Sequence, residues 1–271
     1  MNDQPADERV LNLSGVRNFR DYGGYAVAGG GRVKRGMLWR SGEHGEASDT
    51  DLDHIAALDL RYIVDLRGNG EREVSPCRRH PDFDGDVLFY DGETGGLAPL
   101  LEQNEGTMTE EYAHRAMEAI YADLPNRENL LWIFRRYFAS LNHAAGSATG
   151  TAVGGNLIHC HAGKDRTGMA VALLHHALGV HPDDAMADFL MTNTASDINA
   201  QVAHKAEGMR KKFGPMEDEA VRVFMGVDER YLLAARRAVE ESHGSLDAFL
   251  SDVLNVDDAR RDALRLHWIE A

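Results

Sequence analysis

Short apolar runs divide the chain into candidate strands. They cover residues 37–40, 62–66 and 87–90, and a further run, Leu157-Ile158, ends directly before His159. Runs of this length, bounded by Gly, Asp or Ser, are typical of buried strands. Between residues 10 and 34, a glycine pair and a glycine triplet interrupt shorter apolar stretches, which predicts brief N-terminal strands joined by tight turns.

Apolar residues spaced three and four positions apart predict helices between these strands and after them. Ser48 and Thr109 are suitable N-cap residues for two of these helices, because their side chains can accept a hydrogen bond from a free backbone amide. The helices are expected over about 49–58, 109–121, 126–141 and 167–178, and from Pro182 onward. Strands and helices that alternate in this way predict an α/β fold.

The same pattern suggests one domain over residues 1–271, with three parts that differ in character. Residues 1–9 are polar and are predicted to be disordered. Residues 144–155 contain mostly Gly, Ala, Ser and Thr and are predicted to form a flexible insertion. Residues 195–271 are expected to be all-helical and are a candidate lid, with Asp228, Ser245 and Asn255 as helix caps.

Composition narrows the functional classes. A net charge of −15 argues against a nucleic-acid partner, because no basic face would readily dominate. The two cysteines, Cys77 and Cys160, do not suggest a disulfide framework and fit a reducing compartment. The chain has no apolar run long enough to span a membrane and no apolar leader after a basic start. We therefore expect a cytoplasmic protein, although export without a signal peptide would leave no mark in the sequence.

The segment Asn156–Gly168 carries the chemistry. It reads Asn-Leu-Ile-His-Cys-His-Ala-Gly-Lys-Asp-Arg-Thr-Gly, which predicts a strand, a tight loop and the start of a helix. Amide groups of such a loop, together with the helix dipole, suit a phosphate-sized anion. Cys160 lies at the start of the loop near the cation Arg166, so its thiol is expected to be ionised and nucleophilic. Arg166 can bind two phosphate oxygens with its planar fork, and Gly163 allows the backbone to close.

This segment resembles the signature of the cysteine-based protein tyrosine phosphatases, which is His-Cys, five residues, Arg, then Ser or Thr. His159, Cys160, Arg166 and Thr167 stand at those positions. Together with the Gly-Lys-Asp-Arg sequence, the segments 18–21 (Asn-Phe-Arg-Asp) and 62–67 (Tyr-Ile-Val-Asp-Leu-Arg) are similar to the bacterial tyrosine and phosphoinositide phosphatases.

The resemblance implies a central, mostly parallel sheet flanked by helices. It also implies a phosphocysteine intermediate on Cys160, with Arg166 on the phosphoryl oxygens and Thr167 assisting the leaving thiolate. The remaining loop residues are expected to bind the phosphate or the substrate: His161, Ala162, Gly163 and Lys164. Lys164 would contact phosphotyrosine or a second phosphate on an inositol ring. The implied substrates are phosphotyrosine proteins, possible phosphoserine or phosphothreonine proteins, and phosphoinositides, and the sequence does not choose among them.

The leaving oxygen needs a proton, for which three carboxylic acids are candidates. They are Asp165, Asp91 and Asp65. Many tyrosine phosphatases carry this acid in a Trp-Pro-Asp loop, and that tripeptide does not occur here. In the bacterial family the Asp beside the loop Arg is the suspected acid, so the resemblance favours Asp165, with Asp91 second.

Several charged residues outside the loop have two interpretations. Arg20 and Arg40 are equally suited to supporting the anion site and to pairing with nearby acids. Asp65 and Arg67 end a predicted strand, and a salt bridge between them is the preferred interpretation. The basic group at 204–212 (His204, Lys205, Arg210, Lys211, Lys212) is either a solvated surface or a contact for acidic substrate headgroups.

Other functions for the loop are weaker. A Walker A motif fails because residue 158 is Ile and residue 165 is Asp. A metal site on His159, Cys160 and His161 is disfavoured, because three adjacent residues cannot close a tetrahedral shell; no metal or cofactor is expected. A sulfurtransferase or arsenate reductase also uses an anion-loop Cys, but the second thiol that reduction requires would have to be Cys77, which we expect to be an ordinary free thiol. A catalytically inactive phosphate-binding module is the non-enzyme alternative.

Overall fold

The computed structural model describes residues 8–95, 106–145 and 154–271, and its centre is a five-stranded sheet with the order β1-β3-β6-β4-β5. Four neighbouring strands run parallel, and β1 pairs antiparallel with β3 at one edge. The strands are β1 (Arg20–Asp21), β3 (Leu38–Ser41), β4 (Leu60–Asp65), β5 (Asp86–Phe89) and β6 (Gly155–His159). The predicted α/β fold with a mostly parallel sheet is confirmed. Parallel strands place their carboxyl ends at one edge, where α/β proteins bind ligands.

Strand β6 is the middle strand and is buried along its whole length. Its last residue, His159, lies opposite Ser41 of β3 and Asp65 of β4. Alternate side chains of a strand point to opposite faces, and β6 accordingly contributes Leu157 to one apolar cluster and Ile158 to another. Cys160 follows the strand and belongs to the larger cluster with Ile158.

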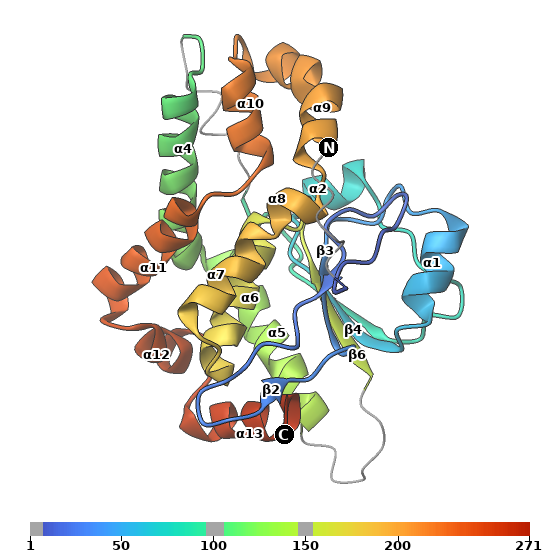
Figure 1. Cartoon of the computed structure of the whole chain (residues 1–271), viewed down its shortest axis with the longest axis vertical. Helices are drawn as coiled ribbons and strands as arrows, with labels where there is room; N and C mark the ends of the chain where they lie inside the picture. The colour runs from blue at the N-terminus through green and yellow to red at the C-terminus, as the bar shows by residue number, and fades with distance from the viewer. Residues whose placement is uncertain (1–7, 96–105, 146–153) are drawn as a thin grey trace.

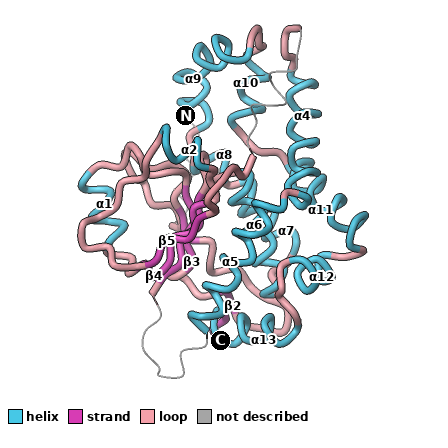
Figure 2. Tube along the Cα trace, turned by 180° about the vertical axis from the view of Figure 1, so that it is seen from behind, coloured by secondary structure: helices cyan, strands magenta, loops and turns pink. Residues whose placement is uncertain are grey.

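The two faces of the sheet are covered unequally (Figures 1 and 2). Helix α1 (Asp49–Ala56) covers one face. Its N-terminus has a capping box in which the Ser48 side chain accepts a hydrogen bond from the Asp51 amide. On the other face, α5 (Glu128–Ala145) and α6 (Asp165–Leu178) pack against the sheet under a thicker helical layer. Gly179 ends α6 with a left-handed conformation at φ 85°.

Three helices extend beyond the sheet in Figure 1: α4 (Glu110–Asp123), α9 (Ile198–Phe213) and α10 (Asp218–Met225). Helix α11 (Glu229–His243) packs along α4 and joins this group to the main body. The remaining helices and strands are β2 (Arg32–Val33), α2 (Asn69–Val74), a 3₁₀ turn (Leu124–Asn126), α7 (Pro182–Leu190), α8 (Thr192–Ala195), α12 (Leu246–Ala248), a π-helical turn (Phe249–Val253), α13 (Asp258–Trp268) and β7 (Ile269–Glu270). None of the described helices combines the length and the apolar character that crossing a bilayer requires.

The predicted helix caps are largely correct. Thr109, Asp228 and Ser245 cap α4, α11 and α12 with their side chains. Asn255 is not a cap: it takes a positive φ of 59°, and Asp257, two residues later, accepts the amide of Arg260 at the start of α13. Both residue types suit either position, so the sequence alone could not choose between them.

The C-terminal part is not helical to its end, contrary to our expectation for residues 195–271. Ile269 and Glu270 form β7, which pairs antiparallel with β2. The pairing follows from the burial of Trp268, whose indole donates to the Leu141 carbonyl and whose own carbonyl accepts from the Lys34 amide. Because Leu141 and Lys34 are far from Trp268 in sequence, no local pattern of apolar residues could predict this strand.

The expected boundaries of the two irregular segments also change. Residues 1–7 of the predicted disordered start lie outside the described residues, whereas the Arg9 carbonyl accepts a hydrogen bond from the Asp21 amide at 3.0 Å. Within the expected insertion at 144–155, residues 144 and 145 still belong to α5 and Gly155 begins β6. The intervening residues 146–153 lie outside the description.

Candidate active site

The loop after β6 closes tightly because Gly163 has no side chain. Its φ is +69°, and a Cβ atom there would lie 2.2 Å from the Ser41 carbonyl oxygen. A left-handed conformation and a backbone contact this close both require glycine. Gly163 therefore fits the loop between β6 and the start of α6, as the sequence predicted.

The loop carbonyls point to the surrounding scaffold. The His161 carbonyl accepts from the Glu43 amide at 3.0 Å. The Gly163 carbonyl accepts from Asn18 Nδ2 at 2.8 Å and from Arg40 Nη2 at 3.0 Å. No described residue accepts a hydrogen bond from the amides of residues 161–164. Because these amides lie on the loop that precedes a helix N-terminus, they are available donors for an anion.

Cys160 lies at the base of this loop and is only 2% exposed. Thr167, in the first turn of α6, is completely buried, and its hydroxyl has no hydrogen-bond partner among the described residues. Most buried hydroxyl groups have a hydrogen-bond partner, so the environment of Thr167 calls for an explanation.

Arg166 is held by acceptors from two other segments. Its Nη1 and Nη2 donate to the two carboxylate oxygens of Glu71 at 2.5 and 2.6 Å. Nη1 also lies 3.0 Å from Thr94 Oγ1 and 3.2 Å from the Leu66 carbonyl oxygen. Burial alone would lower the pKa of Arg166. The hydrogen bonds and charge of Glu71, together with the charges of Cys160 and Asp165, outweigh burial and raise this pKa above its usual value. The guanidinium therefore stays charged.

The geometry leaves part of the Arg166 fork free. Glu71 occupies the edge formed by Nη1 and Nη2, whereas Nε and the second hydrogen of Nη2 have no acceptor among the described residues. These two donors lie on one edge of a planar group, which is the edge that can bind two phosphoryl oxygens. Glu71 thus orients the fork without blocking it.

Glu71 and Thr94 were not predicted from the sequence. Glu71 lies in α2, and its carboxylate also accepts the Gly68 amide at 3.1 Å, in the manner of a helix capping box. Thr94 donates to the Leu66 carbonyl at 2.8 Å from a loop that follows β5. A Glu in a short polar helix and a Thr in a loop carry no pattern that would link them to a residue about 70 to 95 positions later.

Asp165 begins α6 beside Arg166 and accepts a hydrogen bond from the hydroxyl of Tyr121 at 2.8 Å. The same oxygen, Oδ1, lies 3.4 Å from Lys164 Nζ. The Asp165 side chain is 19% exposed, so it reaches solvent while one oxygen is fixed.

Lys164 does not stand free in the loop. Its ammonium donates to the backbone carbonyls of Phe224 at 2.7 Å and Gly226 at 3.0 Å, and the residue is buried. These carbonyls lie at the C-terminal end of α10, where the helix dipole favours a cation. In this conformation Lys164 links the loop to α10, and its expected contact with substrate stays a prediction.

The other two candidate acids are placed less favourably. Asp65 forms a bidentate pair with Arg67, with distances of 2.9 Å to Nε and 2.8 Å to Nη2, which confirms the salt bridge expected at the end of β4. Burial would raise the pKa of Asp65, but the charge that His159 carries when protonated and the hydrogen bonds and charge of Arg67 hold it at about 2, so it stays ionised. Asp91 is exposed and accepts from Asn69 Nδ2 at 2.9 Å.

Arg20 and Arg40 combine the two roles that the sequence left open. Both are completely buried and both pair with Asp188 of α7, Arg40 at 2.6 Å and Arg20 at 3.4 Å. Arg40 also supports the loop through the Gly163 carbonyl. Burial, followed by the neighbouring Arg40, lowers the pKa of Arg20 to about 10, which still leaves it charged.

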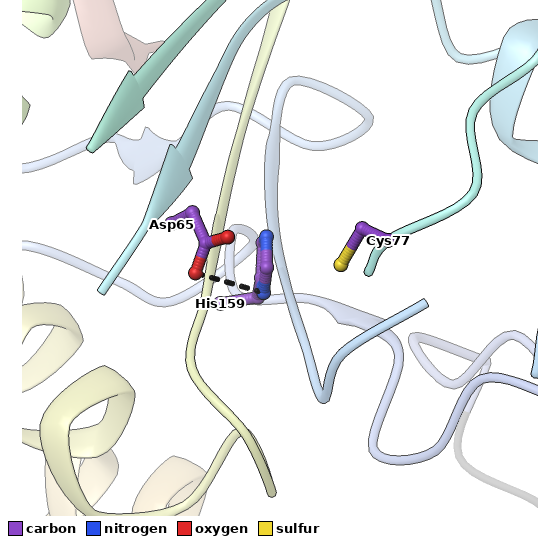
Figure 3. Close-up of side chains that lie close together, drawn as sticks. All are labelled: Asp65, Cys77 and His159. Atoms are coloured by element: carbon purple, nitrogen blue, oxygen red, sulfur yellow. Dashed lines mark ion pairs between the residues drawn. The ribbon is translucent and has the colours of Figure 1, made fainter. Parts of the chain in front are cut away.

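Cys77 lies close to Asp65 and His159, and Figure 3 shows His159 between the other two side chains. Among the described residues, one group has donor atoms close enough to hold a metal ion: Asp65, Cys77 and His159. However, the Arg67 guanidinium already binds both Asp65 oxygens and lies 3.0 Å from Cys77 Sγ. The Arg67 guanidinium therefore already binds two of the three side chains that would have to bind a metal ion. Burial raises the pKa of the Cys77 thiol, which disfavours a thiolate ligand.

The residues of the basic group at 204–212 lie in different environments. Arg210 pairs with Asp218 and donates to the Met216 carbonyl. Lys205 is half-buried, and burial together with the neighbouring Arg17 lowers its pKa. Burial also lowers the pKa of His161, and the charge of Lys205 adds to that shift.

The site matches a family of known proteins. The model of the tyrosine phosphatase family matches residues 11–270. A Cupriavidus necator protein whose name assigns it to the tyrosine-protein phosphatases is 35% identical over 264 residues, covering 96% of this chain and 88% of its own length. The triple specificity protein phosphatase PtpB of Mycobacterium tuberculosis is 30% identical over 273 residues, covering 90% of this chain and 93% of its own.

Proposed function

The chain belongs to the tyrosine phosphatase family and is a protein-tyrosine phosphatase, and from this premise we propose that it acts through a phosphocysteine on Cys160. The observation that carries the proposal is the arrangement around Cys160. The segment that begins with this thiol carries the loop amides, one edge of Arg166 and the Thr167 hydroxyl, none of which has a hydrogen-bond partner among the described residues.

In the first step the Cys160 thiolate attacks phosphorus, and the sulfur–phosphorus bond forms as the bond to the leaving oxygen breaks. The equatorial oxygens accept hydrogen bonds from the amides of His161, Ala162, Gly163 and Lys164. Arg166 supplies two further donors through Nε and Nη2. Donors fixed in position before the reaction stabilise the transition state without a reorganisation cost.

Asp165 is the proposed general acid. Its Oδ1 accepts from Tyr121, so the transferable proton would sit on Oδ2 and pass to the leaving phenol or alcohol oxygen. Asp65 is a weaker candidate because Arg67 binds both of its oxygens. Asp91 is an exposed residue that accepts a hydrogen bond from Asn69, and none of its contacts with described residues involves the loop.

In the second step water attacks the phosphocysteine and gives its proton to the Asp165 carboxylate. The sulfur–phosphorus bond breaks, releasing phosphate and regenerating the thiolate. We assign the Thr167 hydroxyl to this step, because a buried donor without a partner can bond the departing sulfur. The residues described here supply the charge that these steps require, so we expect no metal or cofactor to be needed.

Phosphotyrosine proteins are the first substrate class, and phosphoserine or phosphothreonine proteins and phosphoinositides are the further ones. PtpB carries a name that assigns it three specificities, and this chain is 30% identical to it. We propose that Lys205, whose charge acts on His161 of the loop, contacts a second anionic group on the substrate. We propose no nucleic-acid partner, because the net charge is −15, and a cytoplasmic location, because both cysteines are free thiols.

Two alternatives from the sequence are less well supported. Arsenate reduction would need a thiol that can reach Cys160, whereas Cys77 contacts Arg67 and the His44 amide beside His159. An inactive binding module would not require an unpartnered Thr167 hydroxyl beneath the loop.

The test compares wild type with Cys160→Ser, without added metal, on a phosphotyrosine peptide and a panel of phosphoinositides. We expect phosphate release by the wild type only, with phosphate binding retained by the variant. The ratio of the two wild-type rates would show whether protein or lipid is preferred. Turnover by Cys160→Ser would refute the nucleophile, and no release by the wild type would favour the binding module.

A further inference from the structure

Tyr121 is a buried tyrosine whose only described polar contact is with the site. It lies near the C-terminal end of α4, is completely buried, and donates its hydroxyl hydrogen to Asp165 Oδ1 at 2.8 Å. Burial, and then the negative charge of Asp165, raise the pKa of Tyr121 well above its usual value. The phenol therefore remains a donor at every pH at which the enzyme would work.

The ring of Tyr121 is fixed from two sides. It packs edge-on against Phe189 of α7, with ring centroids 5.9 Å apart, and it makes a tilted contact with Tyr231 of α11, with centroids 5.5 Å apart. Phe189 in turn fills the space beside Gly168 of α6, where a Cβ atom would lie 2.8 Å from its ring. The four helices involved, α4, α6, α7 and α11, lie next to one another in Figures 1 and 2. The hydroxyl thus reaches Asp165 from a rigid aromatic cluster.

The contact determines which oxygen of Asp165 can carry a proton. Oδ1 accepts from Tyr121 and lies 3.4 Å from the Lys164 ammonium, and both interactions favour an unprotonated oxygen there. Oδ2 has no hydrogen-bond partner among the described residues. A proton bound by this carboxyl group therefore belongs on Oδ2.

We infer that Tyr121 is a positioning residue for acid catalysis: it holds Asp165 so that Oδ2 faces the leaving oxygen. The inference rests on the proposed role of Asp165 as general acid. An acid built into the phosphate loop cannot swing in from a separate segment, so its orientation must come from a fixed neighbour. Tyr121 provides that orientation from a helix 44 residues away in sequence.

The inference makes a specific prediction for Tyr121→Phe. This change removes one oxygen and keeps the ring contacts with Phe189 and Tyr231. We expect kcat/KM to fall by about tenfold or more for alkyl phosphates and phosphoserine peptides, whose leaving groups need a proton. For an activated aryl phosphate with a weakly basic leaving group, the loss should be less than about twofold. A plot of log kcat/KM against the pKa of the leaving group should therefore have a steeper slope for Tyr121→Phe than for the wild type.

Tyr137→Phe is the matched control. Tyr137 is also completely buried, and its hydroxyl bonds that of Tyr22 at 2.7 Å within the core. It should keep the wild-type dependence on the leaving group. An equal loss on all substrates for Tyr121→Phe, or no loss, would overturn the inference, because a merely structural role would not depend on the leaving group.

Asp165→Asn separates this inference from the function on which it rests. If Asp165→Asn steepens the leaving-group dependence and Tyr121→Phe does not, the positioning role fails and the general acid stands. If Asp165→Asn itself has no such effect, the general-acid assignment fails, and the inference fails with it. In the Asp165→Asn background, Tyr121→Phe should cause no further leaving-group-dependent loss, because the two residues act as a unit.

Discussion

Arg166 illustrates how one residue depends on a partner that does no chemistry. Its fork can bind two phosphoryl oxygens only if the guanidinium plane is held in the correct orientation. Glu71 does this by binding Nη1 and Nη2 and leaving the other edge free. Thr94 and the Leu66 carbonyl add acceptors on the same side. Glu71 therefore orients the cation that is expected to bind the phosphoryl group.

Replacing Glu71 by Gln should impair catalysis more than folding. The amide keeps the shape of the side chain, but it has one acceptor oxygen and no charge, so the Arg166 plane is less firmly held. We expect kcat/KM on an aryl phosphate to fall at least about tenfold, since small displacements of a catalytic group are costly. Steady-state kinetics and urea unfolding would be measured together.

Glu73→Gln, two residues along α2, is the control, because Glu73 is exposed. It should retain the wild-type kcat/KM. The same loss in both variants would mean that the overall charge of α2 matters and that the contact with Arg166 does not.

Helix α7 links the sheet to the loop through one carboxylate. Asp188 is buried and pairs with Arg20 of β1 and Arg40 of β3, and Arg40 also bonds the Gly163 carbonyl. Burial would raise the pKa of Asp188, but the charges of Arg20 and Arg40 hold it well below its usual value. The carboxylate is therefore ionised between two cations that have no access to water.

Removing this charge should destabilise the protein strongly. Asp188→Asn would leave two buried guanidinium groups without a counter-charge, for which a cost of about 3–5 kcal/mol is expected. The free energy of unfolding in urea measures the effect. Asp183→Asn in the first turn of α7, where the side chain is 92% exposed, should cost less than about 1 kcal/mol. Equal effects of the two changes would contradict a role for Asp188 as the link between α7 and the sheet.

At the scale of the whole molecule, three buried histidines couple stability to pH. His44, His159 and His175 are at most 2% exposed, and burial is the main cause that lowers the pKa of each. They are neutral in the folded protein, whereas an unfolded histidine takes up a proton below about pH 6.5. The stability that these neutral histidines contribute to the free energy of unfolding is therefore fully present above that pH, and it is lost as the pH falls below it.

We expect the free energy of unfolding to fall between about pH 6.5 and 5.5. Each histidine that stays neutral in the folded state contributes a slope of up to about 1.4 kcal/mol per pH unit. Urea unfolding at pH 7.5, 6.5 and 5.5 would measure it, and His175→Asn should reduce the slope. A stability that does not change across this range would show that these histidines accept protons without unfolding.

The sequence predicted the larger elements well, and it also predicted brief strands between residues 10 and 34, where β1 and β2 lie, but it did not predict β7. Helices α1, α4 and α6 and strands β3 to β6 were expected close to where they lie, because each has an apolar period or run of its own. Strands β1, β2 and β7 have two residues each, which is too short for any period. Their existence depends on partners elsewhere in the chain, such as Trp268 and Leu141 for the C-terminal strand.

What the sequence determined by itself is the reactive segment. Cys160, Arg166 and Thr167 lie within eight residues, and Gly163 enforces the turn that brings them together, so their relation is a local property of the chain. Only the tertiary structure decided which residues orient them. Glu71 and Tyr121 reach the segment from 95 and 44 residues away, and Asp188 supports it through Arg40 across 148 residues. Such contacts depend on how helices pack on the sheet, and no spacing along the chain encodes that packing.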